Sequence, residues 1–288
     1  MDPCQKNSLD KRLVLEYREF YDEIYLTINE MDCYSRELEA IERFRTTVKL
    51  IEFLANRRDY KSILDIGSAE GHYGIYLSNR GFDYTAADIS ATCSKKFNFL
   101  KTKGLIERSS QFIICDAKML PIRDLAFDIS LLGEILEHEL LPERVIDEAR
   151  RVSRVAIFTV PILTPGWGIF SERRANELAS EYNSKAKEII RNRGIKDGLR
   201  WIIEKYGAAH VNIFTKSILK NKYFGKYRTK IIGINYELPI RGLIKRRLPK
   251  MYPFLSRFIG IIERATPKGV ILPGHKGAII ICEKKCNQ

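Results

Sequence analysis

Hydrophobic residues in the middle of the chain come in short β-branched runs that alternate with helical stretches. The runs occupy residues 62–66, 84–88, 112–116, 127–132 and 155–160. Alternation of strands and helices builds a parallel sheet through right-handed crossover connections. The pattern therefore predicts one doubly wound α/β domain.

The segments on either side of this region have a different spacing of hydrophobic residues. Residues 9–57 carry apolar side chains at helical spacing, and residues 171–206 are helical and highly charged without a strand candidate. Two further strand candidates, 227–236 and 277–282, come near the end. We therefore divide the chain into a helical cap (1–58), a core (59–165), a helical insertion or lid (166–210) and a last part (211–288) that holds the late strands and a basic segment.

A turn rich in small residues follows the first predicted strand and opens a helix. It reads Leu64-Asp65-Ile66-Gly67-Ser68-Ala69-Glu70-Gly71, and its small residues allow a ligand to approach the backbone. About twenty residues on, the second strand ends in Asp88, where a carboxylate can accept hydrogen bonds from a ribose diol. This pair of features predicts a cofactor that contains a nucleoside.

The same turn argues against two common nucleotide sites. Ala69 stands where the G-x-G-x-x-G fingerprint has its second glycine, and Asp65 would set a negative charge beside a pyrophosphate. Gly269 and Gly274 have the spacing of a phosphate loop, but His275 and Lys276 follow instead of Lys and Ser/Thr. A cofactor with an ammonium and a sulfonium group, S-adenosylmethionine, suits Asp65 better.

Several motifs in order resemble the class I S-adenosylmethionine-dependent methyltransferases of the ubiquinone/menaquinone-biosynthesis type (methyltransferase type 11). The resemblance covers roughly residues 60–162 and rests on the segments 65–71, 88–90, 115–121, 127–138 and 148–152. It implies a Rossmann-like seven-stranded sheet, mostly parallel with one antiparallel late strand and with helices on both faces. Ala69 departs from the family's usual glycine, so this turn must adopt a negative φ or accept some strain.

The resemblance also implies roles for individual residues. Asp65 and Gly67 would hold the methionine end of the cofactor, Asp88 the ribose hydroxyls, and Asp116 with Ala117 the adenine. The remaining predicted cofactor contacts are Ser68, Gly71, Ile89 and Glu134. Each acid also has a structural interpretation, since Asp65 could simply end a strand and Asp116 could cap a turn.

Two histidines are the candidate catalytic residues. His138 follows the fourth predicted strand, and His210 precedes a late helix in a stretch that resembles part of the family's acceptor pocket. A histidine can remove the proton of an acceptor hydroxyl because its unperturbed pKa lies near neutrality. The alternative is that both histidines are structural hydrogen-bonding groups.

The net charge of the chain indicates which kinds of partner it would bind. The chain has a net charge of +13 and a pI of about 9.4, which favours polyanionic neighbours. Residues 241–262 interleave basic and apolar side chains, as interfacial segments do, so we expect peripheral contact with an anionic membrane; a lid packed on the domain is the alternative. Nucleic acid is a less favoured partner because no RNA-binding module accompanies the charge.

The remaining features predict no metal site and a cytoplasmic location. The six cysteines form no zinc-type CxxC pair, no apolar run is long enough to span a bilayer, and the first nine residues do not resemble a signal peptide. The predicted function is transfer of a methyl group from S-adenosylmethionine to oxygen or carbon of a small-molecule, saccharide or lipid-linked acceptor. The alternatives are an RNA methyltransferase and a non-catalytic ligand-binding module.

Overall fold

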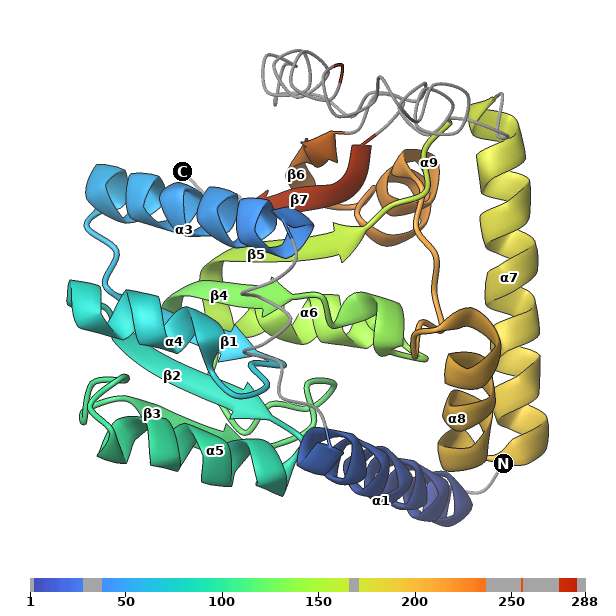
Figure 1. The fold of residues 1–288 in the computed structure, drawn as a ribbon, viewed down its shortest axis with the longest axis horizontal. Coiled ribbons are helices and arrows are strands. Elements are labelled where there is room, and N and C mark those ends of the chain that lie inside the picture. The colour runs from blue at the N-terminus through green and yellow to red at the C-terminus, as the bar shows by residue number, and fades with distance from the viewer. Residues whose placement is uncertain (1–2, 28–37, 166–170, 237–254, 256–274, 284–288) are drawn as a thin grey trace.

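A single seven-stranded sheet forms the centre of the computed structural model, which describes residues 3–27, 38–165, 171–236, 255 and 275–283 (Figure 1). The strand order is β3-β2-β1-β4-β5-β7-β6. The strands span β1 Ser62–Ile66, β2 Asp83–Asp88, β3 Gln111–Ile114, β4 Phe127–Gly133, β5 Ser153–Pro161, β6 Arg228–Tyr236 and β7 His275–Glu283.

The direction of each strand agrees with the predicted topology. Strands β1 to β5 pair in parallel, whereas β7 runs antiparallel to both β5 and β6. The strand order reverses between β1 and β4, and ligands of doubly wound sheets bind at this switch point, beyond the carboxyl ends of the strands. The predicted Rossmann-like fold with one antiparallel late strand is confirmed.

Helices cover both faces of the sheet and bury its apolar side chains. On one face lie α3 (Leu38–Arg58), α4 (His72–Leu77) and α5 (Ala91–Thr102), which contribute Val48, Leu77 and Phe97 to a shared core. On the other face lie α6 (Pro142–Val152) and the turns α9 (Lys216–Ile218) and η3 (Leu219–Tyr223). Strands buried on both faces have near-continuous apolar runs, as the sequence shows here.

Three further helices form a separate layer near the carboxyl ends of the strands (Figure 1). They are α1 (Pro3–Thr27), α7 (Glu172–Arg193) and α8 (Ile195–Tyr206), and they share a core that includes Phe20, Ile190 and Leu199. Gly194 separates α7 from α8 with a φ of +82°. This layer brings residues from the N-terminal end and from residues 172–206 to the same edge of the sheet.

The boundaries of several elements differ from the sequence-based prediction, and two of these differences are informative. The third strand ends at Ile114, so Cys115 and Asp116 lie in the loop after it rather than in the strand. The helical region predicted over 171–206 is two helices, because a residue with positive φ interrupts it. Among the described residues, no helix is both long and apolar enough to cross a membrane.

Candidate cofactor and acceptor site

A cavity of about 490 Å³ opens at the switch point, against the ends of β1, β2 and β4. Almost all of the predicted site residues line it, and these are Asp65, Gly67, Ser68, Asp88, Ile89, Asp116, Ala117, Glu134, His138 and His210. Gly71 is the exception. The structure thus brings together residues that lie up to 145 positions apart in the sequence (210 − 65).

The turn after β1 holds three residues with positive φ, Gly67, Ala69 and Gly71. Gly67 has a φ of +70°, and a Cβ there would lie 2.7 Å from the Ile135 side chain. Ala69 has a φ of +48°, and its N–H donates to Asp88 Oδ2 over 3.0 Å. The sequence left open whether Ala69 has a negative φ or a strained conformation. It has the strained one, which costs an L-residue roughly 1–2 kcal/mol.

Gly71 serves packing rather than the cavity. It precedes α4 with a φ of +88°, and a Cβ at this position would lie 2.7 Å from the Phe97 ring. It does not line the cavity, unlike the other residues predicted to contact the cofactor. The glycine is therefore explained by the close approach of α5 to the turn.

Asp88 is buried at the end of β2 and stays available to a ligand. Its two carboxylate oxygens accept hydrogen bonds from the N–H groups of Ala69 and Ser90, at 3.0 and 2.9 Å. Burial raises the pKa of Asp88, while these hydrogen bonds oppose the increase. A carboxylate offers about four lone-pair positions, so room for a diol remains.

Asp65 is the buried acid on β1. Its carboxylate accepts a hydrogen bond from the Tyr84 hydroxyl at 2.5 Å. Desolvation raises the pKa of Asp65 to about 7, and the nearby Asp88 adds to this increase. A neighbouring cation would favour the charged form, so the position suits a positively charged ligand group.

Asp116 already has partners in the loop after β3. Its Oδ1 accepts from the Lys118 N–H at 2.9 Å and pairs with the Lys118 ammonium group at 2.9 Å. Lys118 also pairs with Glu139 at 2.8 Å. The structural interpretation of Asp116 therefore holds, and its place on the cavity wall beside Ala117 leaves the predicted adenine contact geometrically open.

Glu134 follows β4 in a left-handed conformation, with a φ of +61°. Its carboxylate pairs with Arg43 on α3 at 3.1 Å, and both residues line the cavity. Sequence reasoning did not select Arg43, because a basic residue on a long charged helix carries no signal of its own. Arg43 places a guanidinium group beside the methionine end of the predicted cofactor site.

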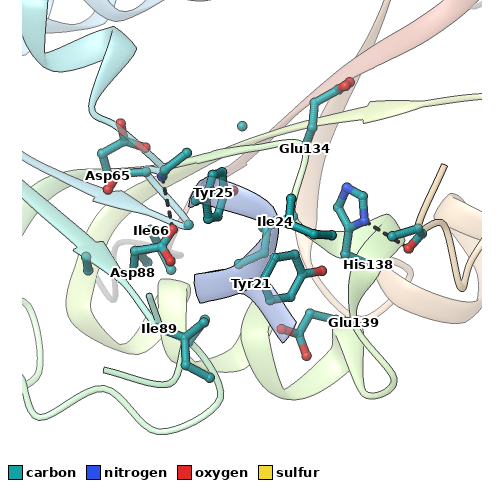
Figure 2. Close-up of a pocket in the computed structure, with 18 of the residues that line it drawn as sticks. Tyr21, Ile24, Tyr25, Asp65, Ile66, Asp88, Ile89, Glu134, His138 and Glu139 are labelled. Carbon is teal, nitrogen blue, oxygen red and sulfur yellow. Dashed lines mark hydrogen bonds between the residues drawn. The ribbon is translucent and has the colours of Figure 1, made fainter. Parts of the chain in front are cut away.

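The two histidines meet at the other end of the cavity. Their ring centroids are 5.1 Å apart with the planes at 67°. His138 Nδ1 lies 3.0 Å from the Ala209 carbonyl oxygen (Figure 2). Because a carbonyl oxygen only accepts, the proton is on Nδ1 and Nε2 carries a lone pair.

Burial favours the neutral form of both imidazoles. Desolvation and the neighbouring His210 lower the pKa of His138 to about 4, and burial lowers the pKa of His210 as well. Their loops are fixed to one another, since the N–H groups of Val211 and Asn212 donate to the Glu137 carbonyl at 2.7 and 2.9 Å. The predicted catalytic pair is thus brought together on the cavity wall.

Helix α1 supplies a wall that the sequence did not reveal. It lies across the cavity and directs Tyr21, Ile24 and Tyr25 toward it (Figure 2). The helix is held near its C-terminal end, where Asp22 accepts hydrogen bonds from the Ser90 hydroxyl and the Thr92 N–H. No local motif marks these residues, because the contact joins positions about seventy residues apart.

Comparison with known proteins supports the class of domain. Residues 64–156 match a family model described as a methyltransferase domain. The match confirms the resemblance to class I methyltransferases that the motifs of the chain indicate. A search of curated proteins finds no match.

Several solved structures with a similar fold are described as methyltransferases. A putative methyltransferase from Bacillus halodurans C-125 is 16% identical, with 82% of this chain and 97% of that chain covered and a TM-score of 0.47. A methyltransferase of Thermotoga maritima, described as a possible histamine N-methyltransferase, is 13% identical over 91% and 97%, with a TM-score of 0.49. The plantazolicin methyltransferase BpumL, in complex with a triazolic desmethylPZN analog and SAH, is 14% identical, with 94% of this chain and 97% of that chain covered and a TM-score of 0.49.

Proposed function

We propose that the chain transfers a methyl group from S-adenosylmethionine to an acceptor bound at the histidine end of the cavity. The observation that carries this proposal is the charge of the cavity wall. Among the described residues, the wall contains five carboxylates and one arginine, although the chain as a whole has a net charge of +13. The carboxylates belong to Asp65, Asp88, Asp116, Glu134 and Glu139. Ion pairs with Arg43 and Lys118 involve three of the carboxylates, so Asp65 and Asp88 are the acids left to attract a cationic ligand.

Such a wall selects among nucleoside cofactors by charge. A dinucleotide would bring a pyrophosphate against the buried acids, whereas a sulfonium cofactor brings positive charge. Arg43 would hold the methionine carboxylate, and Asp65 would accept from the amino group. Asp88 would accept from the ribose hydroxyls and Asp116 from the adenine amino group, each a charge-assisted hydrogen bond of about 1.5–3 kcal/mol.

The cofactor, when bound, supplies an electrophilic methyl carbon. The protein's part is to hold the acceptor atom in line with that carbon and to exclude water. Tyr21 from α1 and the His138–His210 pair line the end of the cavity where the acceptor would lie. We propose an oxygen or carbon acceptor on a small molecule, a saccharide or a lipid-linked molecule.

A catalytic role for the histidines has a kinetic test. If a neutral imidazole removes a hydroxyl proton, His138→Ala or His210→Ala should lower kcat by about 10²-fold or more with cofactor affinity little changed. A methyl-transfer screen with labelled cofactor over lipid, saccharide and RNA extracts finds the acceptor for this assay. Near-wild-type rates in both variants would return the pair to a structural role.

The same screen addresses the alternative functions. Labelled RNA as the main product would favour an RNA methyltransferase that uses the basic surface. A non-catalytic binding module would label no extract, yet native mass spectrometry would still find co-purified ligand. Two observations favour an enzyme over such a module, namely the paired histidines and the methyltransferase-domain match.

Membrane contact remains a proposal from the sequence, because residues 241–254 and 256–262 fall outside the described part of the chain. Each basic residue near an anionic surface contributes on the order of 1 kcal/mol. Sedimentation with anionic and neutral vesicles across a salt series tests it. Retention in the supernatant at low salt, or no effect when Lys245, Arg246 and Arg247 are all replaced by Glu, would contradict it.

A further inference from the structure

A buried carboxylate lies beside the two histidines, and the methyl-transfer site does not use it. Glu137 has no exposed surface, and neither of its carboxylate oxygens accepts a hydrogen bond from the described residues. Arg43, whose charge acts on Glu137, forms an ion pair with Glu134. Leaving a buried carboxyl group without a partner is costly, so a missing ligand is a physical reason for its place.

The surroundings of Glu137 supply two more donor atoms. One carboxylate oxygen of Glu137 and one ring nitrogen each of His138 and His210 all lie within 4.8 Å of one another. Ligand bonds of about 2.0–2.2 Å would bring these atoms to roughly 3–3.5 Å apart. The three side chains would have to rotate to close that gap, and the Glu137 carboxylate has no hydrogen-bond partner among the described residues to lose.

Hydrogen bonds to backbone carbonyls fix the positions of the three candidate ligands relative to one another. Asn212 Nδ2 donates to the carbonyls of Leu136 and Glu139, at 3.2 and 2.6 Å, and so ties the His210 loop to the His138 loop. The Tyr182 hydroxyl donates to the His210 carbonyl at 2.7 Å. Because His138 Nδ1 donates its hydrogen bond to the Ala209 carbonyl, Nε2 carries the lone pair that can bind a metal ion. A hydrogen bond of this kind orients metal-binding histidines in many sites.

We propose that Glu137, His138 and His210 bind a divalent first-row transition metal ion. Two imidazole nitrogens and one carboxylate oxygen suit zinc, cobalt, nickel, manganese or iron, whereas magnesium prefers oxygen ligands throughout. Three protein ligands leave positions open, as in catalytic rather than structural sites. His138 and His210 line the cavity, so an ion that they bind would lie next to it. The sequence, by contrast, predicted no metal site.

The proposal that a metal ion binds here depends only on this geometry. The proposal that the ion activates the acceptor depends also on the proposed function. An acceptor hydroxyl bound to the ion would lose its proton to water more readily. Its oxygen would then form a bond to the methyl carbon as the carbon–sulfur bond breaks, and the sulfur would keep the electron pair. His138 Nε2 would serve as a ligand in this state and not as the base.

Metal binding can be measured without knowing the acceptor. Chelator-treated, tag-free protein is titrated with Co²⁺, Zn²⁺ and Mg²⁺ by calorimetry, and the visible spectrum of the Co²⁺ form is recorded. We expect one equivalent of Co²⁺ and of Zn²⁺ to bind, a d–d spectrum without a thiolate charge-transfer band, and no binding of Mg²⁺. Glu137→Gln and His210→Ala should each weaken Co²⁺ binding by about 100-fold or more.

A matched variant separates this site from other donors. His72 lies on the wall of the same cavity but outside the three-residue cluster, so His72→Gln should leave Co²⁺ affinity within about twofold. No binding below millimolar Co²⁺, or equal affinity in all three variants, would overturn the proposal. Binding of S-adenosylhomocysteine, measured on the same samples, reports folding and the cofactor site separately, so a failed metal titration leaves the proposed function standing.

Discussion

The buried Asp65 should make cofactor binding depend on pH. Its carboxyl has a pKa of about 7 in the folded protein, against an ordinary value of 3.8, because burial disfavours the charge. The amino group of the cofactor needs the ionised form, so binding must release the proton wherever Asp65 still holds it. The affinity is then reduced by the factor 1 + 10^(7 − pH), which is about 11 at pH 6 and about 1.1 at pH 8. We therefore expect binding about tenfold tighter at pH 8, or about 1.4 kcal/mol.

Calorimetry on the wild type and on Asp65→Asn at both pH values gives two affinity ratios. Dividing one ratio by the other cancels the ionisation of the cofactor and of every other group. The variant should bind more weakly at pH 8 and should lose the tenfold dependence. An equal ratio in both proteins would refute the reasoning, because Asp65 would then be ionised already or would not contact the charged group.

The same carboxyl links pH to the stability of the ligand-free protein. The pKa of Asp65 is raised in the folded protein, so the folded state keeps a proton that the unfolded chain loses. The stabilisation from this proton is therefore lost as pH rises from about 4 to about 7. Thermal melts of Asp65→Asn should show a smaller loss of stability across that range than the wild type. Ala69→Gly should relieve the left-handed strain at φ +48° and raise stability by about 0.5–1 kcal/mol; a lower melting temperature would contradict this. Gly71→Ala should destabilise by about 2–4 kcal/mol, since it adds a clash with Phe97 to the backbone strain. Gly104 has a φ of +69° and open space around it, so Gly104→Ala should lose only the stability that the backbone strain costs. If Gly71→Ala and Gly104→Ala lose equal stability in denaturant melts, the clash with Phe97 does not contribute.

Local patterns were sufficient for the sheet. Each parallel strand is an apolar run bounded by turn residues, and an acid at a strand end, such as Asp88, has a position that topology alone dictates. The break at Gly194 was missed because a single glycine within a helical pattern signals little. Boundaries such as the end of β3 at Ile114 depend on the hydrogen bonds that its neighbour β2 supplies.

The site could be predicted only where its residues belong to a motif. Gly71 was assigned to the cofactor because motif spacing does not distinguish backbone that touches a ligand from backbone that touches Phe97. Tyr21 and Arg43 reach the cavity from helices whose position depends on tertiary packing, which periodicity does not encode. Glu137 looks like an ordinary charged residue in the sequence, and only its complete burial makes it a candidate ligand.

The most direct test of a nucleoside sulfonium site is a calorimetric titration of the wild type and Asp88→Ala with S-adenosylmethionine, with NAD as the comparison ligand. We predict one bound cofactor, no binding of NAD, and a loss of about 2 kcal/mol or more in the variant, roughly 30-fold in affinity, because the ribose hydroxyls lose their acceptor. No heat with S-adenosylmethionine at millimolar concentration, together with binding of NAD, would contradict the cofactor assignment and the methyl-transfer function built on it.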